Sequence, residues 1–401
     1  MSANPSSSSK HKRKKIVLFY WIVCAILLLV AFLIWLLIWR FRVYTDDAYV
    51  EGNQVFITPL RPGFVKAIHS DDTFLVKQGQ LLIELDKTDS LIRLNKTKEK
   101  LAQVVREVCQ LFHQVFAYQA EIQVKKAEFI KAEQDLQHRE DVLDVGGVSL
   151  EDFEHAVAAF NASFFSLKWT EALYNKALAA IQGTAIITHP LVLAAADEVR
   201  DAWVQLYRCK IYSPVEGLAA QRTIQVGMWV NPADPLLSVI PLDQIWVNAN
   251  FKETQLKNIR IGQNVKITSD LYGGDIVFHG KVAGLPGGAG NAFSLLPPQN
   301  LSGNWIKIVQ RLPVRVELNP DELKKHPLRI GLSMEATVDL SDKNGPLVPT
   351  STKGSPLYQT PIFEEEEKGD VEMIERIISE NLDPHLSSYA DAPFYSDDAP
   401  P

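Results

Sequence analysis

The length, composition and charge of the chain exclude several classes of protein. Its 401 residues, 46% of them hydrophobic and 22% charged, suit two or three folded domains. Three cysteines are too few, and odd in number, for a disulfide framework, so free thiols are expected. The net charge of −7 is concentrated in residues 341–401, which hold 13 acidic and 4 basic residues. The rest is near neutral and shows no basic patch for nucleic acid.

A transmembrane helix is predicted at residues 16–39. These 24 positions hold no charged residue, and about 20 apolar residues are enough to cross a hydrocarbon core roughly 30 Å thick. A signal peptide is the alternative, but its apolar region is usually about 7–15 residues long and precedes small residues at a cleavage site. Here RFRVYTDD follows instead. Residues 1–15 are basic, so the positive-inside rule predicts a cytoplasmic N-terminus and places the bulk of the chain outside the inner membrane.

A long helix is predicted from residue 88 to residue 143. Apolar residues recur there every seven positions without a gap: Leu94, Leu101, Val108, Val115, Ile122, Phe129, Leu136 and Leu143. A register kept over so many heptads is typical of a coiled coil, because a straight globular helix drifts out of it. At about 1.5 Å per residue such a helix would be roughly 84 Å long.

The heptad pattern then turns back. Residues 144–149, DVGGVS, interrupt it, and Ser149 with Asp152 forms a plausible capping box for a second helix. The pattern resumes at Phe153 and continues to Cys209, with a break around Gly183 and Pro190. Residues 88–209 are therefore interpreted as one antiparallel α-hairpin with its tip at 144–149. Separate globular helices are the alternative.

Two similar β-rich segments lie on either side of this hairpin. The stretch TPLRPGFVKAIHSDDTFLVKQGQLLIELD at 58–86 resembles SPVEGLAAQRTIQVGMWVNPADPLLSVI at 213–240, with glycines where turns between short strands need them. A hairpin returns the chain to its starting point. Residues 45–87 and 210–241 are therefore predicted to pair as two halves of one small β domain.

A second β module is predicted at residues 242–340. Five or six short β-runs alternate there with Gly and Pro turns, among them IWVNANF, QNVKITS and WIKIVQRLPVRVEL, and such runs suit a small barrel or sandwich. The glycine-rich segment GLPGGAG at 284–290 resembles a phosphate-binding loop, but it lacks the Gly-Lys-Ser/Thr ending of such loops. It is interpreted as a loop between strands.

Residues 341–401 are predicted to be an acidic, disordered tail. The run Glu364–Glu367 is interpreted as solvated, and 371–382 could form one short amphipathic turn of helix without an assigned function. No catalytic constellation is visible in the chain. The nine histidines are scattered and no metal-ligand spacing occurs, so we expect no enzyme activity, no metal and no cofactor.

The chain resembles the periplasmic adaptors, or membrane fusion proteins, of the HlyD and EmrA type. The segments IWVNANFKETQLKNIRIGQNVKITSD (245–270), AFSLLPPQNLSGNWIKIVQRLPVRVEL (292–318) and PLRIGLS (327–333) are similar to the barrel of the EmrA-type multidrug adaptors. The resemblance spans about residues 40–340. It implies an α+β fold class: a transmembrane helix, a split lipoyl-like (barrel-sandwich hybrid) domain interrupted by a long coiled-coil α-hairpin, and then a β-barrel domain.

The resemblance also implies a function and partners. Such adaptors link an inner-membrane major facilitator drug transporter to a TolC-like outer-membrane channel, and they associate with themselves in a ring, a trimer or a hexamer. That would place this chain in the inner membrane of a Gram-negative bacterium, with its bulk in the periplasm. An adaptor of a type I protein secretion system, paired with an ATP-binding cassette transporter, is the alternative. A lipoyl or biotinyl carrier with Lys87 as the modified residue is a more distant one.

The hairpin tip is the candidate site for partner binding. Adaptors that dock on an outer-membrane channel resemble one another in an Arg, a Leu four residues later and a Ser about seven residues beyond that. Arg139 and Leu143 fit this pattern, and Ser149 falls one residue short of it. From the residues alone, Arg139 is equally a surface charge of the coiled coil and Leu143 a heptad core position.

Overall fold

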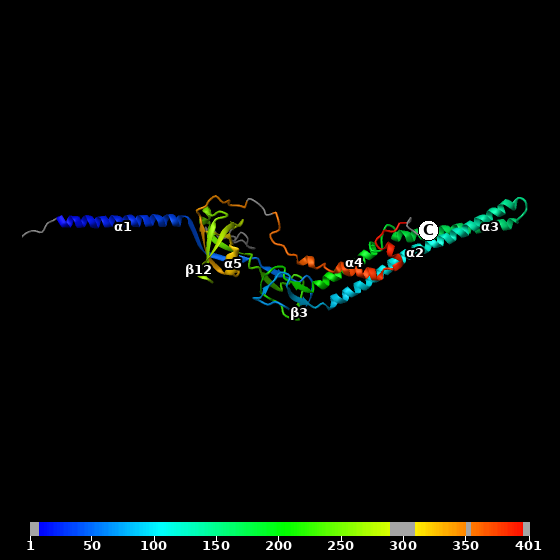
Figure 1. Cartoon of the computed structure of the whole chain (residues 1–401), viewed down its shortest axis with the longest axis horizontal. Coiled ribbons are helices and arrows are strands. Elements are labelled where there is room, and N and C mark those ends of the chain that lie inside the picture. Colours follow the sequence, from blue (N-terminus) through cyan, green and yellow to red (C-terminus); the bar gives the residue numbers. More distant parts are fainter. Residues whose placement is uncertain (1–7, 289–308, 350–353, 396–401) are drawn as a thin grey trace, which may run out of the picture.

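The structure is a computed structural model that describes residues 8–288, 309–349 and 354–395. Over these residues the molecule is elongated (Figure 1). Helix α1 (Ser8–Arg40) extends from one end, a β-barrel follows it, a lipoyl-like β domain comes next, and the helical hairpin extends to the far end. Within α1, residues Ile16–Leu36 are long and apolar enough to cross a membrane, and none of that stretch is buried against the rest of the protein.

The barrel is closed by six strands in the order β1, β10, β13, β12, β11, β14. Their bounds are β1 (Arg42–Gly52), β10 (Ile245–Lys252), β11 (Asn264–Ser269), β12 (Gly273–Gly284), β13 (Arg311–Leu318) and β14 (Ser333–Asp339). The short helices η1 (Glu253–Asn258) and α5 (Pro320–Lys325) lie in its connections. The expected run at 305–318 is strand from Arg311 onward, and residues 292–308 lie outside the described residues.

Strand β1 corrects the expected start of the lipoyl-like domain at residue 45. It pairs antiparallel with both β10 and β14, so it belongs to the barrel. Its inward side chains, Ala48 and Val50, are fully buried in the barrel core, whose remaining members come from the C-terminal module. Without β1 the strands β10 and β14 would each expose an unpaired edge. The strand next to the membrane helix therefore closes a barrel whose other strands begin about 200 residues later.

The lipoyl-like domain consists of two four-stranded sheets, each built from both halves of the sequence. One sheet has the order β2, β9, β7, β4 and the other β6, β5, β3, β8. The bounds are β2 (Val55–Ile57), β3 (Gly63–Ile68), β4 (Leu75–Val76), β5 (Leu81–Leu85), β6 (Lys210–Tyr212), β7 (Gly217–Ala220), β8 (Trp229–Val230) and β9 (Leu237–Ile240). The expected pairing of the two segments across the hairpin is confirmed.

The hairpin consists of α2 (Thr88–Leu143), α3 (Leu150–Ile181) and α4 (Pro190–Tyr207). Helix α2 packs along α3 in its distal part and along α4 near its base. The break that the sequence predicts around Gly183 and Pro190 separates α3 from α4, and we call residues 182–189 the joint. The heptad residues Leu94, Leu101, Val108 and Val115 are buried, whereas Ile122, Phe129, Leu136 and Leu143 are only half-buried.

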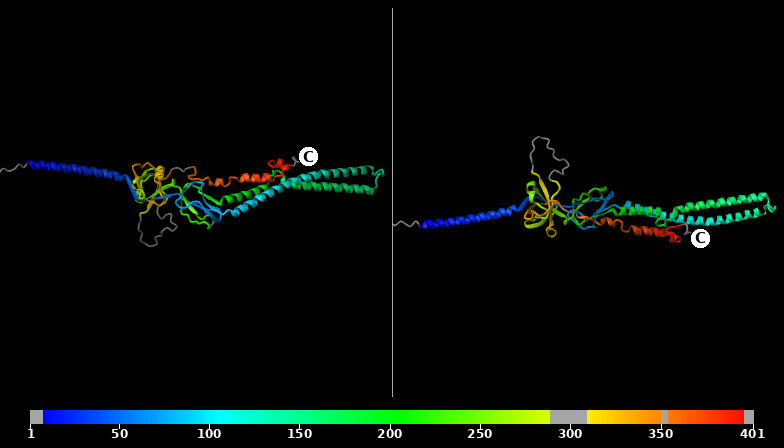
Figure 2. Two further views of the ribbon diagram at one scale, coloured as in Figure 1. Left: turned by 60° about the horizontal axis from the view of Figure 1, so that its bottom comes forward. Right: turned by 90° about the horizontal axis from the view of Figure 1, so that it is seen from above.

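The C-terminal segment is not a disordered tail in the part that the structure describes. It forms η3 (Ile362–Glu365), α6 (Asp370–Asn381) and η4 (Pro384–Tyr389), and α6 packs against α2 and α4. Both views of Figure 2 show this segment, in orange to red, running beside the base of the hairpin. The disordered tail was wrong for this part, although the amphipathic turn suggested at 371–382 corresponds to α6. The acidic composition hides one apolar face, formed by Ile374, Ile377 and Ile378. We call residues 360–395 the C-terminal strap.

Replacing Gly217 with alanine should destabilise the lipoyl-like domain. A Cβ at this position in β7 would overlap the carbonyl oxygen of Ile240 in the neighbouring strand. Overpacking of this kind costs about 1–3 kcal/mol, which urea unfolding followed by circular dichroism would detect. Gly274→Ala is the matched control, since nothing lies within 4 Å of its added Cβ. Equal stability of the two variants would contradict the close approach of β7 and β9.

Candidate functional site

The hairpin tip brings the three predicted residues together at the end of the molecule farthest from α1 (Figure 1). Arg139 and Leu143 lie in the last turns of α2, and Ser149 is the residue before α3. Between the two helices the chain turns through Gly146, whose φ of +75° lies in the left-handed region that favours glycine. Several described side chains of the tip are exposed, so it offers a surface for contact.

Arg139 joins the two helices at the tip. Its guanidinium forms an ion pair with Asp135 one turn earlier, at 3.2 Å, and donates a hydrogen bond to the carbonyl oxygen of Asp152 in α3, at 2.8 Å. About a third of the Arg139 side chain is exposed, at 32%. Arg139 therefore holds α3 in position and still presents part of its charge to solvent.

Ser149 is the N-cap of α3, as the capping box predicted. Its hydroxyl accepts a hydrogen bond from the backbone amide of Asp152 at 3.1 Å and donates one to the Asp152 carboxylate at 2.6 Å. The hydrogen bond from Ser149 is the largest influence that lowers the pKa of Asp152 below its usual value. The serine hydroxyl is thus engaged within the tip, in the role of a cap.

The most exposed apolar side chains at the tip are not the predicted ones. Val145 in the turn is 81% exposed and Leu150 at the start of α3 is 65% exposed, whereas Leu143 is half-buried between the helices. Sequence reasoning assigned Leu150 to the heptad pattern of the second helix and gave Val145 no role. An apolar residue placed in a solvated turn was the signal that could have identified Val145.

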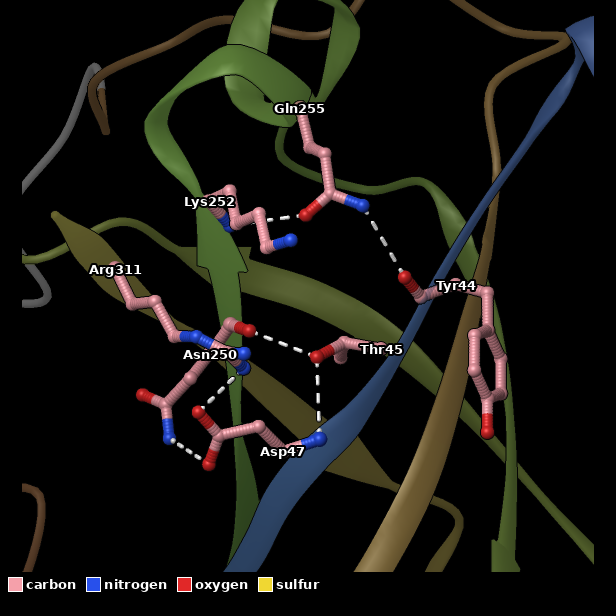
Figure 3. A network of polar contacts seen from close by, with 7 residues as sticks. All are labelled: Tyr44, Thr45, Asp47, Asn250, Lys252, Gln255 and Arg311. Atoms are coloured by element: carbon pink, nitrogen blue, oxygen red, sulfur yellow. Dashed lines mark hydrogen bonds and ion pairs between the residues drawn. The ribbon is translucent and has the colours of Figure 1, made fainter. Parts of the chain in front are cut away.

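A second candidate feature is a network of polar contacts in the barrel, around the first residues of β1 (Figure 3). The Thr45 hydroxyl donates to the carbonyl oxygen of Asn250 at 2.8 Å and accepts from the backbone amide of Asp47 at 3.2 Å. The Asp47 carboxylate accepts from the Asn250 side chain at 3.1 Å and pairs with Arg311 at 2.6 Å. These contacts tie β1 to β10 and β13 at the β-bulge between Thr45 and Ala48.

Two further contacts extend the network across the end of the barrel. The Gln255 amide nitrogen donates to the carbonyl oxygen of Tyr44 at 3.3 Å, and its oxygen accepts from the backbone amide of Lys252 at 2.9 Å. Since β1 begins two residues after α1 ends, these contacts hold the strand that follows α1 against the rest of the barrel.

Among the described residues, no group of three or more His, Cys, Asp or Glu side chains could hold a metal ion. Lys87 is exposed and immediately precedes α2, so it does not occupy the tight turn between strands that a carrier lysine requires. The thiols of Cys109 and Cys209 are free and buried, and burial raises the pKa of Cys109. Buried thiols with a raised pKa are poor nucleophiles.

The two larger modules match known families. A family model described as the EmrA α-helical hairpin domain matches residues 88–209, and one described as an AAEA-like β-barrel domain matches residues 244–340. The hairpin match has the same bounds as the helical segment predicted from the heptads.

Relatives with similar sequences span most of the chain. The "Probable multidrug resistance protein EmrK" of Escherichia coli K12 is 44% identical over 343 residues, which cover 84% of this chain and 88% of the relative. The "Multidrug export protein EmrA" of Haemophilus influenzae is 37% identical over 381 residues, covering 94% and 98%. A solved structure of the periplasmic adaptor protein EmrA aligns at 15% identity with a TM-score of 0.38, covering 75% and 98%. On the strength of its sequence relatives, the chain belongs to the EmrA type of the periplasmic adaptor, or membrane fusion protein, family.

Proposed function

We propose that this protein is the periplasmic adaptor of a tripartite multidrug efflux pump. It would link a major facilitator transporter in the inner membrane to a TolC-like channel in the outer membrane. The observation that supports this most directly is the separation of two ends: the apolar helix α1 lies at one end of the molecule and the hairpin tip at the other (Figure 1). A helix of 56 residues alone spans roughly 84 Å, a reach that suits a bridge across a periplasm.

The anchor fixes the orientation of this bridge. The basic residues before the span favour a cytoplasmic N-terminus, and everything from the barrel onward would then lie in the periplasm. The span Ile16–Leu36 contains no Asp, Glu, Lys or Arg, which suits an anchor rather than a proton relay. Energy for transport would therefore come from the transporter. Several copies would surround it as a ring, with the hairpins side by side.

The substrates are proposed from the names of the relatives. Both EmrK and EmrA are named as multidrug proteins, and hydrophobic small molecules would be the corresponding cargo. A protein secretion adaptor is the alternative, and the multidrug names of the relatives favour drug efflux.

Cross-linking in native membranes tests the proposal against its rival. The protein is cross-linked, purified, and its partners are identified by mass spectrometry. Recovery of a multi-pass facilitator together with an outer-membrane channel is expected. Recovery of an ATP-binding transporter would instead assign the chain to secretion, and a deletion strain would then lose secreted proteins and keep its drug resistance.

Substituting Arg139 and Leu143 at the tip should weaken binding of the adaptor to the outer-membrane channel. Arg139→Asp with Leu143→Ala reverses the exposed charge and removes the neighbouring apolar contact. Loss of such central contacts costs about 2 kcal/mol or more, a roughly 30-fold loss of affinity, so cross-linking to the channel and drug resistance should both fall sharply. Asp135→Asn is the control, because it removes the ion pair of Arg139 but leaves its bond to Asp152. An unchanged double variant would refute docking through these residues.

Ser149 should act on docking through its cap. Ser149→Ala removes the side-chain acceptor and costs about 1 kcal/mol, whereas asparagine is as good an N-cap as serine. We expect the alanine variant to speed hydrogen exchange at the Asp152 amide by about fivefold and to weaken cross-linking to the channel. The Ser149→Asn variant should keep both properties near wild type. If Ser149→Asn protects the amide but still loses the channel, the serine hydroxyl itself contacts the partner.

A further inference from the structure

The C-terminal strap buries an apolar face against the base of the hairpin. Ile374, Ile377 and Ile378 of α6 are at most 9% exposed and share one core with α2 and α4. The strap then ends on aromatic side chains. Phe394 is fully buried and packs edge-on against Phe112 and Phe116 of α2, with ring centroids 5.9 and 5.8 Å apart. The strap is therefore part of the hairpin's core.

Two buried carboxylates hold the strap to α4. Asp370, at the start of α6, is 1% exposed and pairs with Arg200 at 2.9 Å. Glu366 is 7% exposed and accepts two hydrogen bonds from Arg208, at 2.8 and 3.0 Å. The expectation that the whole run Glu364–Glu367 is solvated is therefore wrong for Glu366. A buried carboxylate is tolerated only where it is paired, so each arginine is needed to keep the strap in place.

The far end of the strap hydrogen-bonds the joint between α3 and α4. The backbone amides of Gly183, Ile186 and Ile187 donate to carbonyl oxygens of the strap at 2.8, 3.1 and 3.2 Å. The amide of Phe394 donates back to the carbonyl oxygen of Thr184 at 3.1 Å. Ile186 is fully buried, so its amide does not reach water in this arrangement. The strap thus supplies the backbone partners that the interrupted helix lacks.

The strap covers only one side of the helix pair. On the opposite side, α2 and α4 face a charged surface groove crossed by the exposed ion pairs Arg93–Asp201 at 2.8 Å and Lys100–Glu198 at 2.6 Å. Exposed pairs of this kind contribute only about 0–1 kcal/mol each. These surface pairs therefore add little to holding α4 against α2, whereas the strap contacts the joint directly.

We propose that the C-terminal strap is an intramolecular brace that locks the joint and fixes the direction of the distal hairpin. The second arm is interrupted at residues 182–189, so α3 and α4 would otherwise pivot about this point along the continuous α2. The strap holds the base of the second arm through the arginine pairs, the joint itself through backbone hydrogen bonds, and α2 through the aromatic contacts of Phe394. This role is a property of the chain alone and holds whichever transporter or channel it serves.

Hydrogen exchange of the full-length protein in detergent tests the brace. Arg200→Gln leaves the Asp370 carboxylate buried and unpaired, which should release the strap. Exchange at the amides of Gly183, Ile186 and Ile187 should rise by at least about 100-fold. Arg200 lies 13 positions beyond Ile187, roughly 20 Å along α4, so an effect at the joint must pass through the strap. Acceleration confined to the turns around Arg200 would overturn the proposal.

Matched variants separate the brace from a general loss of stability. Arg93→Gln makes the same chemical change in an exposed pair on the opposite side and should alter joint exchange by less than about fivefold. Phe394→Ala removes the aromatic end of the strap. It should raise hydrogen exchange at the joint amides as Arg200→Gln does. If Arg93→Gln accelerates hydrogen exchange at the joint amides as much as Arg200→Gln does, the strap is not the specific support of the joint and the proposal fails.

Spin-label distances test whether the brace fixes direction. Nitroxides are attached at Glu140→Cys near the tip and Lys77→Cys on the lipoyl-like domain, both exposed, with Cys24 replaced by serine. The wild-type strap should give a narrow distance distribution, and Arg200→Gln a clearly broader one. An unchanged distribution, together with released joint amides, would show that the strap only covers apolar surface and does not brace the hairpin.

Discussion

The antiparallel return of the hairpin is the constraint on which the rest of the structure depends. Strand β5 ends at Leu85 and β6 begins at Lys210, and the two pair only because the helices between them bring the chain back to its starting point. Closing a loop of more than 120 residues costs entropy that grows slowly with length, and the buried interface of α2 with α3 and α4 offsets it. Both sheets of the lipoyl-like domain inherit this dependence, since each contains strands from both halves.

A second closure of the same kind joins the apolar helix α1 to the barrel. Strand β1 follows α1 almost directly and completes a barrel whose other strands come from the C-terminal module. The Asp47–Arg311 pair and the bond from Thr45 to Asn250 secure it where it bulges. The chain therefore passes through the lipoyl-like domain twice. Paired strands, rather than flexible linkers, connect α1, the barrel and the hairpin.

The sequence predicted those elements whose signal is local and repeated. The first helix was predicted to span 88–143 and does so, because eight heptads determine both its period and its ends. Strand β1 was assigned to the wrong domain because its alternation fits either β module, and its partners lie about 200 residues away. The strap was predicted as a disordered tail with one short amphipathic turn at 371–382, because the acidic composition of the segment outweighed the apolar face of Ile374, Ile377 and Ile378. At the tip, the Ser149 cap was predictable, whereas the bond from Arg139 to Asp152 depends on the register between two helices.

Burial along the hairpin is graded from base to tip. Near the base, three helices and an aromatic cluster enclose Val108, Phe112 and Val115 completely. Beyond the strap only two helices remain, and Phe129 and Leu136 are half-buried at positions equivalent in the heptad. Local stability follows such packing, so the tip lies at the less stable end of a rod whose base is held firmly. A surface that must fit a partner benefits from this arrangement, because the base sets the direction of the rod while the last turns of α2 and α3 can adjust on contact.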